Sequence, residues 1–171
     1  MDTHGVFRSD LMSGTDVAAD LVSVKYMGKD GNTETAIDNG CVVKLSGLMA
    51  GEREVWKGVT PDANTALSDI AIIGSEEVMY DERKKNLDEF ENTAGTISRG
   101  YVPRSRNIFS ATKDSLNIGN GVTPSVGFAV ELMDGVKLNV VASATSGSTQ
   151  VGEIIAIEPA GRYTYYVVRI V

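Results

Sequence analysis

The chain of 171 residues has very few residues of the kinds that most often carry out chemistry in proteins. It has one histidine, His4, and one cysteine, Cys41. A single histidine near the start is unsuited to a Ser-His-Asp or Cys-His arrangement, and a single cysteine excludes an internal disulfide. The ligand count is too low for a zinc site, and no calcium-binding Asp-x-Asp-x-Asp-Gly loop is present. We therefore expect no catalytic residue, no metal site and no cofactor.

Long apolar runs and an excess of positive charge are also missing. No segment approaches the roughly 20 apolar residues of a transmembrane helix, and the start lacks the basic and apolar regions of a secretory signal. The net charge is −7 and the sequence pI is about 4.7. A nucleic acid or an anionic membrane would require a basic patch on the protein, so we expect neither as a partner. We expect the protein to be soluble.

Aromatic residues make up only 6% of the chain, whereas glycine occurs 18 times. This composition favours short strands joined by turns. Residues 21–27, 41–45, 52–57 and 69–74 are strand-like, Cys41 fits a small buried position, and 33–37 is a weaker strand. The clearest hairpin pairs 128–133 with 136–141 around Asp134-Gly135, a sequence that suits a type I′ turn. Residues 114–127 are interpreted as a surface loop.

Residues 75–91 break this strand pattern with dense charge. Ser75 is a plausible helix cap, acidic residues follow it, and charge pairs recur four residues apart. Tyr80, Leu87 and Phe90 would form a narrow apolar stripe, and residues 92–95 would end the helix. We therefore predict an all-β fold, a mainly antiparallel small barrel or sandwich, with one short amphipathic helix and an extended N-terminal arm.

We predict two parts, an arm of residues 1–16 and a single β-rich domain of residues 17–171. Burying Val6, Phe7, Leu11 and Met12 of the arm would contribute about 6–12 kcal/mol. Fixing the arm's backbone would cost about 16–32 kcal/mol. The arm should therefore be disordered in the free protein and become ordered on a partner that supplies backbone hydrogen bonds, as in strand addition to a sheet edge.

A second candidate contact region is the one basic cluster of this acidic chain, Arg99, Arg104 and Arg106 beside Tyr101. Arginine and tyrosine are enriched among interface hot spots, which favours an anchor for an acidic protein surface. A nucleic-acid site and a merely solvated loop are the alternatives. The tyrosine-rich C-terminal strand, residues 162–171, is expected to offer an edge for pairing between subunits.

Four segments in this order resemble structural proteins of tailed bacteriophages, and among them a head decoration, or auxiliary capsid, protein. They are GEREV at 51–55, VMYDER at 78–83, FENTAG at 90–95 and RGY at 99–101. At 104–109 the chain has RSRNIF where the resemblance implies Gly-Asp before the phenylalanine. The resemblance implies a non-catalytic β-rich protein, often trimeric, that binds the major capsid protein on the outside of the virion and stabilises the head. Such a protein is assembled in the host cytoplasm.

Two further function classes remain open at this point. The chain could be a β-barrel binding module that recognises a carbohydrate or a receptor on a phage or bacterial surface. An enzyme is the third possibility, since paired carboxylates across a cleft would suffice for a glycosidase.

Overall fold

The computed structural model describes residues 3–14 and 20–171, and in them strands dominate. The helical elements are three-residue 3-10 turns, η1 (Leu67–Asp69), η2 (Leu87–Glu89) and η3 (Lys113–Ser115). No helix of this part of the chain is long and apolar enough to cross a bilayer. The strands are β1 (Phe7–Leu11), β2 (Leu21–Tyr26), β3 (Val42–Leu48), β4 (Val55–Val59), β5 (Ile70–Ile73), β6 (Ile97–Tyr101), β7 (Ile108–Ala111), β8 (Leu116–Ile118), β9 (Ala129–Glu131), β10 (Leu138–Val141), β11 (Gln150–Ala160) and β12 (Tyr163–Ile170).

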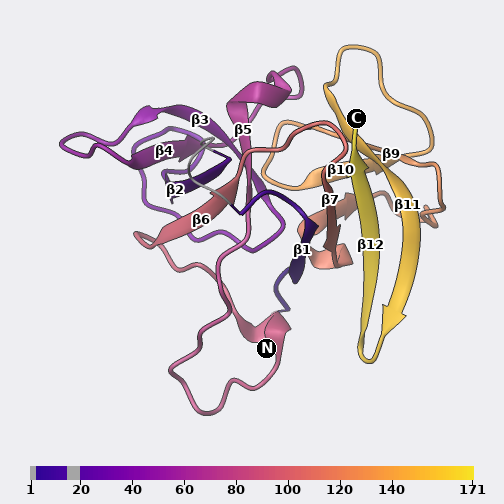
Figure 1. Ribbon diagram of the computed structural model, residues 1–171, viewed down its shortest axis with the longest axis horizontal. Coiled ribbons are helices and arrows are strands. Elements are labelled where there is room, and N and C mark those ends of the chain that lie inside the picture. The colour runs from indigo at the N-terminus through magenta and orange to yellow at the C-terminus, as the bar shows by residue number, and fades with distance from the viewer. Residues whose placement is uncertain (1–2, 15–19) are drawn as a thin grey trace.

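The strands form two bodies (Figure 1). One is a closed barrel with the order β2-β4-β3-β5-β6, and the other is a seven-stranded sheet with the order β1-β7-β12-β11-β9-β10-β8. Among the paired strands, β2 with β4 and β8 with β10 run parallel and the others run antiparallel. The predicted mainly antiparallel β fold with a small barrel is therefore confirmed.

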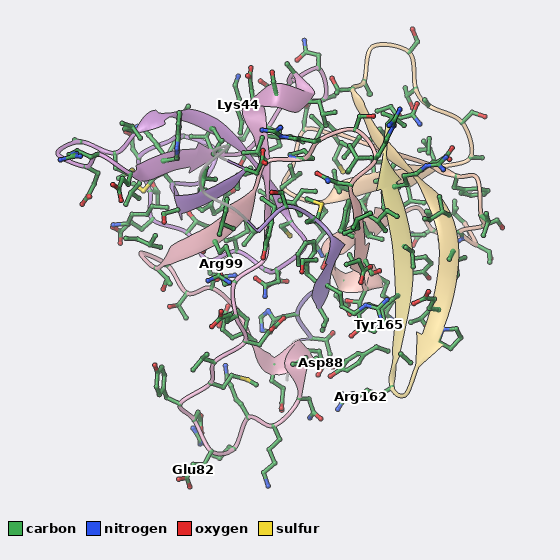
Figure 2. The ribbon with its side chains drawn as sticks, in the orientation of Figure 1. Lys44, Glu82, Asp88, Arg99, Arg162 and Tyr165 are labelled. Atoms are coloured by element: carbon green, nitrogen blue, oxygen red, sulfur yellow. The ribbon has the colours of Figure 1, made fainter. Side chains whose placement is uncertain are left out.

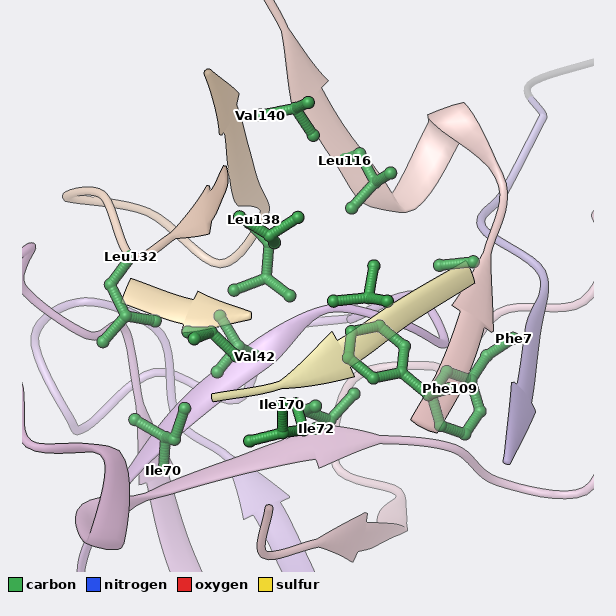
Figure 3. Close-up of a cluster of buried hydrophobic side chains, with 14 of the residues drawn as sticks. Phe7, Val42, Ile70, Ile72, Phe109, Leu116, Leu132, Leu138, Val140 and Ile170 are labelled. Atoms are coloured by element: carbon green, nitrogen blue, oxygen red, sulfur yellow. The ribbon is translucent and has the colours of Figure 1, made fainter. Parts of the chain in front are cut away.

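The barrel and the sheet share one hydrophobic core. Side chains on successive residues of a strand point to opposite faces of the sheet, and both faces of β5 are buried. Ile70 and Ile72 pack with Phe109 and Ile170 of the sheet in the cluster shown in Figure 3, whereas Ala71 and Ile73 belong to a second cluster inside the barrel. β5 therefore joins the two bodies.

The barrel interior is narrow enough to require glycine. A Cβ atom at Gly58 of β4 would lie 2.7 Å from Cγ1 of Val24, closer than side-chain carbons approach. At Gly100 of β6 it would lie 3.0 Å from Cγ2 of the same valine. The barrel closes around Val24 because its neighbours on both sides lack side chains at these levels.

Several predicted strands are confirmed, including β2 and the fully buried β5. Cys41 lies buried immediately before β3, where loss of solvation raises the pKa of its thiol to about 12. The pairing of β9 with β10 is also confirmed, but its register is shifted by one residue. A type I′ turn at Asp134-Gly135 would place Val130 opposite Asn139, whereas Val130 pairs with Val140. The chain bends at 134–137, and Oδ1 of Asp134 accepts a hydrogen bond from the amide of Ala63 at 3.0 Å.

Three other local predictions are not confirmed. Residues 33–37 form a single bridge, Ile37 with Asn92, in place of a strand. The loop expected at 114–127 contains β8, which pairs with β10. The amphipathic helix expected over 75–91 is also absent, and only η2 is helical there. Side-chain and backbone bonds to other parts of the molecule hold this segment extended.

The arm of residues 1–16 is described from Thr3 to Gly14, and there the expectation of disorder is wrong. Val6 and Phe7 are 1% and 8% exposed, and β1 pairs antiparallel with β7. Ordering of the arm requires a surface that supplies backbone hydrogen bonds, and strand β7 of the same chain is that surface. Residues 1, 2, 15 and 16 lie outside the described residues.

The expected free edge at the C-terminus is also wrong. β12 lies between β7 and β11 and pairs with both. The outer strands of this sheet are β1 and β8. Val168 and Ile170 are two residues apart, so they lie on the same face of β12, and both belong to the shared core.

The packing of the arm predicts that Phe7→Ala lowers the free energy of unfolding by about 3–5 kcal/mol, because it leaves a cavity beside Phe109 and Tyr101. Leu11→Ala is the matched control in the same strand. Leu11 is 63% exposed, so this change should stay within about 0.5 kcal/mol. Urea unfolding of both variants measures the difference, and equal effects would show that β1 does not pack as described.

Candidate functional site

The longest connection between strands of the barrel runs from Gly74 to Thr96, between β5 and β6, and we call it the long loop. Figure 2 shows it extending away from both β bodies, with Glu82 at its far end. Structureless connections of more than about 12–15 residues are uncommon in compact domains and are often functional. The long loop is therefore the first candidate site.

A buried network of amides fixes the base of the long loop to the barrel. The side chain of Asn39, fully buried, donates to the carbonyl of Ser75 at 2.9 Å and accepts from the amide of Ser75 at 3.0 Å. The side chain of Asn92 donates to Oδ1 of Asn39 at 3.0 Å and to the carbonyl of Ile37 at 3.1 Å. Buried polar groups that are fully paired stabilise one defined arrangement.

The return half of the long loop has its own internal bonds. Oε2 of Glu89 accepts from the amides of Lys85 and Asn86, each at 2.7 Å. These bonds to the charged form lower the pKa of Glu89. At the far end, Nη2 of Arg83 lies 2.8 Å from Oδ2 of Asp81, and this arginine lowers the pKa of Asp81. Local side-chain bonds therefore add to the long-range bonds that hold the loop extended.

Asp88 of η2 connects the long loop to the sheet and to the arm. Its carboxylate accepts from Nη2 of Arg162 at 3.0 Å and from the hydroxyl of Tyr163 at 3.1 Å, both at the tip of the β11–β12 hairpin. Its backbone carbonyl accepts from the amide of His4 at 2.9 Å. Figure 2 shows Asp88 and Arg162 side by side. Three segments distant in sequence meet at this residue.

The arm has a second attachment beside Asp88. Nδ1 of His4 lies 2.8 Å from Oδ1 of Asp38, and the amide of Gly5 donates to Oδ2 of the same aspartate at 3.3 Å. His4 therefore positions the arm against the barrel, a structural role for the one histidine of the chain.

The long loop presents apolar side chains to solvent although it is anchored at its base and at Asp88. Tyr80 is 94% exposed and Val78 is 55% exposed. They line a hollow of about 420 Å³ together with Met79 and Phe90. Exposed large apolar groups gathered in one place are a mark of an interaction surface. We call these four residues the loop face.

Charge around the loop face is predominantly negative. Residues 74–96 contain seven acidic side chains and three basic ones. The basic residues are the consecutive Arg83, Lys84 and Lys85, whereas the acidic ones are spread along the loop. A partner surface with basic groups around an apolar centre would complement this arrangement.

Of the predicted contact residues, Val6, Phe7 and Tyr101 are 1%, 8% and 9% exposed, which leaves little of their surface for a partner. The ring centroids of Phe7 and Tyr101 lie 5.9 Å apart. Met12 is half-buried and packs on the shared core, which leaves Leu11 as the one predicted arm residue with most of its surface exposed.

The three predicted arginines do not form one free basic cluster. Arg99 pairs with Glu76 at 3.2 Å, and Arg104 pairs with the buried carboxylate of Asp20. Arg106 is exposed in the β6–β7 connection, where it has a φ of 75°. Because acidic partners neutralise two of them, these arginines are poor anchors for an acidic surface.

Among the described residues no group of three or more histidine, cysteine, aspartate or glutamate side chains is placed to hold a metal ion. Comparison of the chain with protein-family models, with curated proteins and with solved structures finds no match.

The sequence signal for the loop face was the dense charge of residues 75–91, which was interpreted as a helix. In a helix Tyr80 would lie on the inner apolar stripe with Phe90. In the extended loop Tyr80 points to solvent instead. The residues that hold the loop, Asn39, Asn92 and Asp88, carry no local signal because their partners are distant in sequence.

The Asp88 contacts predict that Asp88→Ala frees the long loop and raises the rate of trypsin cleavage at Arg83–Lys85 by about tenfold, since the loss of charge-assisted hydrogen bonds favours local opening. Glu52→Ala, which removes an exposed carboxylate from the β3–β4 turn, is the control and should cleave as the wild type. Timed digestion with mass spectrometry gives the rates. An unchanged rate in Asp88→Ala would contradict the anchoring role.

Proposed function

We propose that the chain is a virion structural protein that binds the outer surface of a tailed-phage capsid through the loop face and stabilises the head. The observation that carries the proposal is the full exposure of Tyr80 on a loop that is anchored in the free protein. The identity of the partner rests on the resemblance to phage decoration proteins. One of the four segments that carry this resemblance, residues 78–83, contributes three of the four residues of the loop face.

Anchoring of the loop supports a binding role on energetic grounds. Ordering a flexible loop on association costs free energy that subtracts from affinity. The amide network at Asn39 and the contacts at Asp88 have already met this cost during folding. Tyrosine is one of the three residue types that are enriched among interface hot spots.

The proposed occupant of the loop face is the major capsid protein. The acidic side chains around Tyr80 favour a capsid surface with basic groups around an apolar pocket. Leu11 and Arg106 lie at another part of the molecule, near the β6–β7 connection, and are proposed as secondary contacts.

The resemblance also implies a trimer, which we include in the proposal. Strand pairing between subunits through β1 is disfavoured, because the register of β1 shifts between Arg8 and Leu11 and Asp10 has a φ of 34°. Bulged edge strands resist edge-to-edge association. Subunits of the trimer would therefore meet through side chains. Light scattering that shows a strict monomer, both free and after release from particles, would contradict this part.

Cosedimentation with particles assembled from the major capsid protein of the same phage genome tests the proposal. Tyr80→Ser should weaken binding by about 30-fold, the ratio expected for loss of a hot spot. Leu48→Ser removes an apolar side chain of the barrel that is 46% exposed and should bind as the wild type.

Two outcomes would overturn the proposal. One is no binding of the wild-type chain to such particles. The other is equal binding by wild type and Tyr80→Ser, which would move the contact away from the loop face.

A further inference from the structure

A second candidate site lies on the sheet, where two hollows share Tyr166 in their linings. One has a volume of about 330 Å³ and the other about 360 Å³, and both are lined by Lys113, Asp114 and Tyr166. Since they share these three residues, we treat the hollows as one groove. We call it the Tyr166 groove.

The curl of the sheet produces the groove. In the strand order β8 is an outer strand, separated from β12 by β10, β9 and β11. Yet η3 joins β8 directly to β7, the strand that pairs with β12 on its other side. The sheet must therefore bend back on itself, and the two strands approach without pairing. Leu116 and Ile118 of β8 and Tyr166 of β12 all line the second hollow.

The groove differs from the loop face in its chemistry. Its first hollow is lined by two carboxylates and two cations, the Asp88–Arg162 pair among them, and by the threonines Thr3, Thr112 and Thr164. The second hollow adds Lys137, so the whole groove carries one net positive charge in a chain with a net charge of −7. A site with nearly balanced charge and many hydroxyl groups suits a neutral, polyhydroxylated ligand better than an ion.

Two polar groups in the groove are available to a ligand. Within residues 3–14 and 20–171, the ammonium of Lys113 and the hydroxyl of Tyr166 make no hydrogen bond or ion pair. Tyr166 is half-buried and packs against the core, which fixes its ring in place. A rigid ring shared by two polar hollows offers a face for the apolar side of a sugar, and the side chains around it offer donors and acceptors for hydroxyl groups.

From this geometry we infer that the Tyr166 groove binds a neutral oligosaccharide, with sugar units in both hollows. The two hollows favour a ligand of at least two units over a single sugar. This binding site is separate from the loop face, so the chain would hold a capsid through one surface and a glycan through the other.

A microarray of bacterial and host glycans probed with the labelled full-length chain tests the inference. We expect binding to neutral oligosaccharides and not to single sugars. Tyr166→Ala should lower the affinity by about tenfold, and Tyr166→Phe should retain most of it, because the ring makes the contact.

Lys113→Ala is the second variant, chosen because Lys113 is exposed and its loss should not disturb folding. It should weaken binding by about fivefold through loss of one charge-assisted hydrogen bond. Lys44→Ala, a lysine on β3 of the barrel labelled in Figure 2, is its control and should bind as the wild type.

Three outcomes would overturn the inference: no glycan bound above background, glycan binding unchanged in both Lys113→Ala and Tyr166→Ala, or binding of unstructured peptides in place of glycans. The result is separable from the proposed function. Tyr80→Ser should retain glycan binding, and Lys113→Ala should retain capsid binding.

Discussion

The carboxylate of Asp88 is the interaction on which the arrangement of the functional surfaces depends. A buried carboxylate is costly unless it is paired and hydrogen-bonded. Arg162 and Tyr163 meet that requirement from the hairpin tip, and the carbonyl of Asp88 receives the arm through the amide of His4. Asp88 therefore positions the long loop, lines the Tyr166 groove and binds the arm through the amide of His4.

The shared core makes this arrangement possible. Because β5 packs on the sheet with one face and fills the barrel with the other, the two bodies have a fixed relation at the point where the long loop begins. The loop can then reach from the barrel to the hairpin of the sheet. Rigid elements that position a polar or aromatic group are the usual basis of precise binding sites.

Local patterns were sufficient to predict the fold class and the position of several strands along the chain. The burial of β5 and of Cys41 follows from short apolar runs, whose meaning does not depend on distant partners. The helix at 75–91 was wrong because charge pairs four residues apart also fit an extended chain when Asn92 and Asp88 bond elsewhere. The arm was wrong because the edge of β7 could not be inferred from residues 1–16. The Tyr166 groove depends on the bending of a whole sheet, which no local pattern encodes.

Hydrogen exchange along the long loop tests the central claim, that the loop is anchored in the free protein while its apolar face is exposed. The account predicts slow exchange at the amides of Ser75 and Asn92, which bond to Asn39 and Ile37. Fast exchange is predicted at Met79 and Tyr80, beside the exposed face. Uniformly fast exchange from residue 75 to residue 92 would contradict the account, because the loop face would then have no fixed form before binding.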